Sequence, residues 1–129
     1  MLSPVFDSQG AQPEIPTTIT ARGIGVIYKD EKVTVTAFST KHAMESYGYR
    51  FQTPDRTIVI SGDTNPVEET IRACNGCDIL LHEAQHLQLL AKMPESIQSF
   101  DAKYHTTTEQ LAEIGDESQA EIARYLSYR

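Results

Sequence analysis

Long apolar runs are absent from the sequence, and this absence limits where the protein can work. No stretch approaches the roughly 18 apolar residues that a membrane-spanning helix needs. The start of the chain also lacks the basic and then apolar pattern of a secretory signal peptide. We therefore predict a cytoplasmic protein with no membrane partner.

Basic residues are also few. The chain holds 11 Lys and Arg against 18 Asp and Glu, which gives a formal net charge of −7. A protein that binds a phosphate backbone usually presents a basic face, and this balance leaves little material for one. Nucleic acid is therefore disfavoured as a partner, and the simplest role of the acidic excess is to keep the protein in solution.

Cysteine is scarce as well, since Cys74 and Cys77 form a single C-x-x-C around Asn75-Gly76. A structural zinc site needs a second pair of ligands nearby, and redox motifs of this spacing usually lie where a strand runs into a helix. Here the pair follows a helical pattern and encloses a turn. We interpret the cysteines as two small buried residues that flank the turn, because free cysteine packs as a small hydrophobe.

Five short segments have the composition of β-strands. They are β-branched or apolar, are separated by turn residues, and cover residues 24–28, 33–38, 47–52, 57–60 and 78–82. A chain of 129 residues with 40% hydrophobic residues can bury the core of one domain. We predict a single α/β domain over residues 23–129, preceded by an extended arm over residues 1–22.

A helix is predicted between the fourth and fifth of these strands. Asn65 would be its N-cap, Pro66 its first residue, and Glu68 stands three residues after the cap. Strand, helix and strand in this order predict a βαβ unit with a parallel strand pair. Three more helices are predicted: one over residues 87–93, one that starts at Thr106, and one over residues 118–128. The helix from Thr106 has Glu109 in the capping-box position, and Gly115 ends or bends it.

Three polar side chains are predicted at one edge of the sheet. Asp63 follows the buried strand 57–60, His82 ends the next strand, and His105 precedes the helix from Thr106. In α/β sheets, ligands collect beyond the carboxyl ends of the strands. The group is therefore a candidate for holding a metal ion, although each residue alone is more often a turn aspartate or a structural histidine.

His82, Glu83 and His86 also fit the pattern H-E-x-x-H. On a helix, histidines four residues apart share a face and bind zinc, while the glutamate activates the bound water. The residues before His82 are typical of a strand instead, and His105 is the one further candidate ligand. A zincin-like metallopeptidase therefore stays as a third hypothesis.

Four segments follow one another along the chain: Tyr47-Gly48-Tyr49-Arg50-Phe51, Ser61-Gly62-Asp63-Thr64, Leu80-Leu81-His82-Glu83-Ala84 and His105-Thr106-Thr107. Taken in this order, they resemble the second half of metallo-β-lactamase-fold hydrolases of the ribonuclease Z-like and arylsulfatase-like branch. The resemblance runs from about residue 33 to residue 113, and it implies a partial αββα sandwich with a mixed sheet and flanking helices.

The resemblance also implies roles for individual residues. The family's aspartate at the position of Asp63 bridges two metal ions, usually zinc. The segment that matches His82 and Glu83 supports the site, and the histidine that matches His105 protonates the leaving group. Enzymes of this kind hydrolyse phosphodiester, ester or related bonds with a metal-activated hydroxide.

Two motifs of the family are missing from the chain. The main metal motif, H-x-H-x-D-H, belongs to an N-terminal half that the chain does not contain, and residues 124–129 offer Tyr, Ser and Arg where a later histidine is expected. Asp63 alone cannot hold a zinc pair, because zinc needs about four ligands per ion. We therefore predict a truncated domain that is inactive alone, with zinc absent or incompletely bound.

The missing half has a structural consequence. In the family two sheets pack face to face, so half of the fold would leave apolar surface and an unpaired strand edge. We predict that a homodimer or a partner chain covers this surface. The alternative is an active metal-dependent hydrolase of phosphodiester or ester bonds, with its site completed by another chain or by a missing segment.

Overall fold

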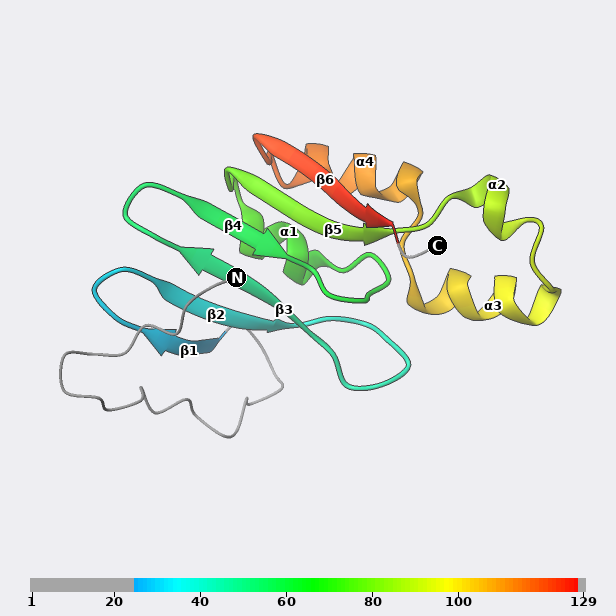
Figure 1. Cartoon of the computed structure of the whole chain (residues 1–129), viewed down its shortest axis with the longest axis horizontal. Helices are drawn as coiled ribbons and strands as arrows, with labels where there is room; N and C mark the ends of the chain where they lie inside the picture. The colour runs from blue at the N-terminus through cyan, green and yellow to red at the C-terminus, as the bar shows by residue number, and fades with distance from the viewer. Residues whose placement is uncertain (1–24, 128–129) are drawn as a thin grey trace.

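The computed structural model describes residues 25–127 of the chain (Figure 1). The predicted N-terminal arm, residues 1–22, lies outside the described residues. Within residues 25–127, no helix combines the length and the apolar character that crossing a membrane requires. The elements follow one another as β1 (Gly25–Lys29), β2 (Thr34–Ser39), β3 (Tyr47–Gln52), β4 (Thr57–Ile60), α1 (Glu68–Cys74), β5 (Ile79–Ala84), α2 (Leu87–Leu90), α3 (Glu95–Tyr104), α4 (Thr108–Glu117) and β6 (Ile122–Ser127).

The strands of the described region form one sheet in the order β1-β2-β3-β4-β5-β6. Neighbours from β1 to β4 are antiparallel, whereas β4 with β5 and β5 with β6 are parallel. At least one helix connects the two strands of each parallel pair. It is needed because the chain must run back along the length of the first strand before a parallel strand can begin. The structure confirms the predicted mixed sheet with flanking helices and the predicted βαβ unit.

The buried core lies between the sheet and the helices α1 and α4. Phe38, Val59 and Leu80 project from β2, β4 and β5 and are fully buried, and Ile114 of α4 packs against them. Gly48 on β3 lies opposite Phe38, where an added Cβ would be 2.2 Å from the aromatic ring. A residue with a side chain therefore cannot replace Gly48 without moving the core.

The other face of the sheet is apolar too. Side chains alternate between the two faces along a strand, so the neighbours of the core residues point away from α1 and α4. We call this surface the open face, and Ile122 and Leu126 on it are 41% and 59% exposed. Its apolar members include Val35, Ala37, Tyr49, Phe51, Ile58, Ile60, Ile79, Leu81, Ile122 and Leu126, and the same face also carries Glu83 and Arg124.

The last described element is a strand, although the sequence predicted a helix over residues 118–128. Strand β6 pairs in parallel with β5 over its whole length. Helix α4 ends at Glu117, and Gln119 takes a positive φ of 53° that breaks the helical path. The short mixture of apolar and polar residues fits the period of a helix as well as that of a strand. The prediction was wrong because the segment pairs with the edge of β5, which would otherwise be unpaired, and so forms a strand.

Helix α1 begins later than predicted. It starts at Glu68 with Val67 as N-cap, not with Asn65. Asn65 instead pairs with Lys41 in an isolated bridge, and its side chain donates to the backbone oxygen of Ala102 at 3.1 Å. The predicted cap was wrong because these contacts with distant segments take the side chain that would have capped the helix.

The other helices differ from the predictions in their bounds. Helix α4 starts with Thr107 as N-cap and Gln110 as the partner in the capping box, one residue later than predicted, and Gly115 lies inside it. The helix predicted over residues 87–93 is shorter, since α2 ends at Leu90. Helix α3 follows Pro94, where no element was predicted.

Cys74 and Cys77 form a disulfide around a tight turn. Both residues are buried, and Asn75 and Gly76 between them have φ values of 40° and 80°. The prediction of two buried residues that flank a turn is confirmed, whereas the expectation of free thiols was wrong. Because the left-handed turn reverses the chain, it brings the two side chains close enough to bond.

Candidate active site

Asp63 lies in the loop directly after β4, as predicted. Gly62 before it has a φ of 65°, and an added Cβ there would lie 2.8 Å from the backbone oxygen of Tyr47, so the loop requires glycine. Asp63 is half-buried and faces a cavity of about 130 Å³. Because several lining residues belong to the open face, the cavity lies on that side of the sheet. Its lining consists of Ile60, Ser61, Gly62, Asp63, Leu81, Glu83 and Leu126.

Glu83 connects the Asp63 loop with His105. Strand β5 carries Glu83, and its Oε1 accepts a hydrogen bond from the backbone N–H of Thr64 at 2.9 Å. The same oxygen lies 2.9 Å from Nδ1 of His105, at the end of α3. The side chains of His105 and Glu83 are only 2% and 6% exposed, so the pair is shielded from water.

Burial and hydrogen bonding shift the pKa of the Glu83 carboxyl in opposite directions. Burial raises the pKa of Glu83 above its usual value of 4.5, because the charged form loses its hydration. The N–H of Thr64 and the neighbouring His105 partly offset this rise by favouring the charged form. A carboxyl of this kind takes up a proton more readily than one on the surface.

His82 does not lie where the sequence predicted. Strand β5 continues to Ala84, so His82 stands inside the strand and faces the helices, on the side away from the Asp63 cavity. It is fully buried, and its Nδ1 lies 2.7 Å from the backbone oxygen of Glu83. Burial lowers the pKa of His82 below 6.5. The predicted place of His82 at the edge of the sheet was wrong because the strand is two residues longer than expected.

Rings from two segments surround His105. His42, in the loop between β2 and β3, meets the His105 ring edge-on with 5.1 Å between centroids. The centroid of the Phe100 ring on α3 lies 6.3 Å from that of His105, and the Tyr104 ring is tilted against His42 with 6.0 Å between centroids. The imidazole of His105 is therefore held by packing as well as by Glu83.

Thr64 and Thr106 complete the connections, and the sequence did not single them out as site residues. The hydroxyl of Thr106 donates to the backbone oxygen of Thr64 at 2.7 Å, and the hydroxyl of Thr64 accepts from the backbone N–H of Lys41 at 3.0 Å. Both threonines are fully buried. The one feature of the sequence that could have indicated a role for them is that Thr64 directly follows Asp63 and Thr106 directly follows His105. The structure thus brings the Asp63 loop, Glu83 and His105 together.

A model of the family described as the β-lactamase superfamily domain matches residues 3–126, which is nearly the whole chain. The chain belongs to the β-lactamase superfamily. The order of the matched segments and the mixed sheet agree with this assignment, so the predicted resemblance to metallo-β-lactamase-fold, ribonuclease Z-like proteins is confirmed.

Curated relatives of this superfamily member include ribonucleases Z. The ribonuclease Z of Bacillus licheniformis is 25% identical over an alignment 180 positions long, which covers 99% of the chain and 57% of the relative. The ribonuclease Z of Picrophilus torridus is 37% identical over 62 residues, which cover 47% of the chain and 18% of the relative. The chain spans about half the length of the curated relatives it matches.

Solved structures show the same fold. The short form of human tRNase Z matches with a TM-score of 0.65 at 22% identity, covering 83% of this chain and 40% of that one. The metallo-β-lactamase-fold protein YhfI from Bacillus subtilis matches with a TM-score of 0.62 at 18% identity, covering 79% of this chain and 40% of that one. At these identities the likeness concerns the fold alone.

The residues of this superfamily member do not by themselves fit a zinc ion. Within residues 25–127, no three His, Cys, Asp or Glu side chains gather closely enough to hold a metal ion. Zinc in proteins takes about four ligands in most structural sites and three plus water in catalytic ones. Asp63 would therefore need ligands from outside the described residues.

The zincin hypothesis is wrong. His82 and Glu83 lie on a β-strand, where neighbouring side chains point to opposite faces. His86 follows at the N-cap of α2 and is exposed, whereas His82 is fully buried. The two histidines cannot share one face of a helix, which is the arrangement that zinc binding by H-E-x-x-H requires.

Proposed function

We propose that this chain is the C-terminal half of a metal-dependent hydrolase domain and that it is inactive alone. In the proposal, His105 is the proton donor to the leaving group, Glu83 is its positioning residue, and Asp63 is one metal ligand. The observation that carries the proposal is the buried contact between Glu83 and His105, held against the Asp63 loop by the N–H of Thr64.

The geometry supports a role in proton transfer. With Nδ1–H donated to Glu83, the tautomer and the orientation of the His105 ring are fixed, and Nε2 is the atom that exchanges a proton with substrate. The packed rings around His105 limit its rotation. Glu83 thus acts through His105, and it also lines the cavity that Asp63 faces.

The incomplete ligand set supports inactivity of the isolated chain. Asp63 provides one carboxylate, and bound zinc would supply Lewis-acid chemistry only with further ligands. The later histidine of the family was expected on a strand within residues 124–129, and strand β6, which covers Ile122–Ser127, holds no histidine. Tyr125 in this segment is 52% exposed and projects to the helix side, away from the Asp63 cavity.

A second copy of the chain is our proposed cover for the open face. Ile122 and Leu126 leave apolar surface there, and closed twofold dimers are the commonest way to bury such a surface. Leu126 also lines the Asp63 cavity, so any chain that covers the open face reaches the site. This contact favours the alternative function, an active hydrolase of phosphodiester or ester bonds completed by another chain. The predicted cytoplasmic location stays a prediction.

The test is hydrolysis of bis(p-nitrophenyl) phosphate and p-nitrophenyl acetate by the purified chain with added zinc. We expect no turnover above that of zinc alone. Turnover that is lost in Asp63→Asn and kept in Asp55→Asn, an exposed aspartate in the turn before β4, would contradict the proposal and establish the alternative.

A further inference from the structure

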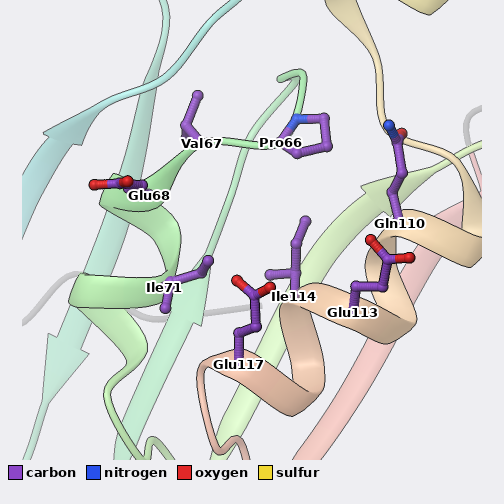
Figure 2. Close-up of a pocket in the computed structure, with 8 residues that line it drawn as sticks. All are labelled: Pro66, Val67, Glu68, Ile71, Gln110, Glu113, Ile114 and Glu117. Atoms are coloured by element: carbon purple, nitrogen blue, oxygen red, sulfur yellow. The ribbon is translucent and has the colours of Figure 1, made fainter.

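The cavities of the described region differ in the polar groups that line them. A larger one lies between α1 and α4, and its acidic side chains Glu113 and Glu117 are exposed, so water already solvates them (Figure 2). A smaller one lies beside α2 and α3 and has buried polar residues in its wall. We call it the α2–α3 cavity, and it is lined by Gln85, His86, Leu89, Leu90, Met93 and Asp101.

Two polar residues of the α2–α3 cavity are buried. Gln85 is 5% exposed, and among residues 25–127 its Nε2 has no hydrogen-bond partner. Asp101 on α3 is 2% exposed, and a carboxylate accepts hydrogen bonds. Buried polar groups in proteins are nearly always hydrogen-bonded. A buried donor and a buried acceptor at one cavity therefore point to a small polar ligand that lies between them.

The size of the α2–α3 cavity selects this ligand. The space that the centre of a water molecule can occupy there is about 10 Å³, which is room for one water and not for a larger molecule. A water accepts a hydrogen bond from Gln85 and donates one to Asp101, so it satisfies both groups at once. A metal ion suits the cavity less well, because an amide N–H does not bind a cation. Within residues 25–127, no three His, Cys, Asp or Glu side chains gather to hold one.

The backbone of Gln85 holds the chain on the other side of His105. Its N–H donates to the oxygen of Thr106 at 2.9 Å, and its oxygen accepts from the N–H of Thr108 at 3.2 Å. Asp101 lies in the last turn of α3, and its backbone oxygen accepts from the N–H of His105 at 2.8 Å. Gln85 thus binds the segment after His105 through its backbone and shares a cavity with the helix turn before it.

We propose that Gln85 is a positioning residue for His105 and that it acts through one buried water, which accepts from Gln85 and donates to Asp101. The water joins the end of β5 to the last turn of α3, while the backbone contacts of Gln85 fix the segment that follows. His105 is held in this way from both sides along the chain, in addition to its contact with Glu83. The role in catalysis rests on the proposed function of His105, whereas the water and its two contacts do not.

The water is tested by NMR on the full chain. We expect a nuclear Overhauser effect from a long-lived water to the side-chain amide protons of Gln85, and its loss in Asp101→Leu, which removes the acceptor. The exposed Gln88 is the internal control and should show no such effect. A wild type without this effect at Gln85, or one in which the amide of Gln85 bonds Asp101 directly, would overturn the inference.

The positioning role is tested by hydrogen exchange of the Nδ1 proton of His105. We expect this proton to exchange about tenfold faster in Gln85→Leu than in the wild type, because the segment opens locally, whereas the backbone amide of Val59 in the core keeps its protection. Gln88→Leu is the matched control, since Gln88 is exposed on α2, and it should behave as the wild type does.

Two results of the exchange measurement would overturn the positioning role. One is an unchanged exchange rate of the His105 proton in Gln85→Leu. The other is an equal acceleration at His105 and at Val59, because the loss of stability would then be general. Neither readout requires turnover, so this inference can fail while the proposed function holds, and the proposed function can fail while this inference holds.

Discussion

At the scale of single residues, Glu83 joins three segments of the chain. Its Oε1 accepts from the backbone N–H of Thr64 and lies within hydrogen-bond distance of Nδ1 of His105, at 2.9 Å each. All three residues are buried, so water cannot replace the carboxylate as an acceptor. One carboxylate oxygen therefore links the other two segments, beside the hydroxyl of Thr106 that also bonds the Asp63 loop, and its removal affects both the fold and the placement of His105.

Two substitutions of Glu83 distinguish the contribution of its acceptor oxygen to stability from the contribution of its charge. We expect Glu83→Ala to lower the free energy of unfolding by about 1–3 kcal/mol, because buried donors are left unpaired. Glu83→Gln keeps an acceptor oxygen and avoids the cost of burying a charge, so it should be less destabilising. Urea unfolding measures both, with exposed Glu31→Ala as the control. An equal loss in the Gln and Ala variants would show that the charge, not the acceptor, stabilises the site.

His82 should make the stability depend on pH. Because burial lowers its folded pKa below 6.5, the unfolded chain takes up a proton before the folded chain does as the pH falls. The contribution of His82 to stability is therefore lost below about pH 6.5. Glu83, with its raised folded pKa, acts in the opposite sense above about pH 4.5, so the effect of His82 must be isolated by substitution.

The substitution that isolates this effect is His82→Gln. We expect urea unfolding of this variant to show a smaller loss of stability than the wild type between about pH 7 and about pH 5.5. His86→Gln is the matched control, because His86 is exposed and close in sequence. If the stability of His82→Gln depended on pH as steeply as that of the wild type, His82 would not be the group responsible for this dependence.

At the scale of elements, the start of α4 places His105 and Thr106. Thr107 caps the helix through the backbone N–H of Gln110, and Gln110 reaches back to the backbone N–H of Thr107. This capping box fixes the direction in which the chain leaves the site. Thr106, one residue before the cap, is then positioned to bond the Asp63 loop.

Removing the cap tests this role. We expect Thr107→Ala to lower the free energy of unfolding by about 1 kcal/mol, because the N–H of Gln110 loses its acceptor. Thr108→Ala, inside the first turn, leaves the cap intact and serves as the control in the same thermal or urea unfolding. Equal losses in the free energy of unfolding of the two variants would contradict the role of Thr107 as the helix cap.

The sequence allowed most elements of the sheet to be predicted, but not the orientation of every site residue. Segments 47–52 and 57–60 were located because apolar or β-branched runs end at clear turns. His82 was misplaced because a strand longer by two residues changes which residues reach the edge. The contact of Glu83 with His105 joins residues 22 positions apart, so no local pattern could reveal it.

At the scale of the whole molecule, helices α1 and α4 cover one face of a single sheet (Figure 1). The opposite, open face carries a set of apolar side chains. The chain spans 57% of the Bacillus licheniformis ribonuclease Z that it matches. In the proposed half of a sandwich, the open face is the surface on which the other half would pack. The position of Leu126, between the open face and the Asp63 cavity, connects assembly with the site.

The open face should control association. We expect the wild type to be a dimer by light scattering, and Leu126→Lys to shift the mass to that of a monomer, because a charge on the interface lacks water or a partner. Tyr125→Lys is the matched control, since Tyr125 is 52% exposed against 59% for Leu126 and lies on the same strand but faces the other side. A dimer that persists in Leu126→Lys and dissociates in Tyr125→Lys would place the interface elsewhere.

The central claim is that this chain holds only part of a metal-dependent site. Elemental analysis of the purified chain, after dialysis against zinc and then against zinc-free buffer, tests the claim most directly. We predict less than one tightly held zinc per chain, because Asp63 is the one proposed ligand and zinc needs about four. Two zinc ions per chain, lost in Asp63→Asn, would contradict the account.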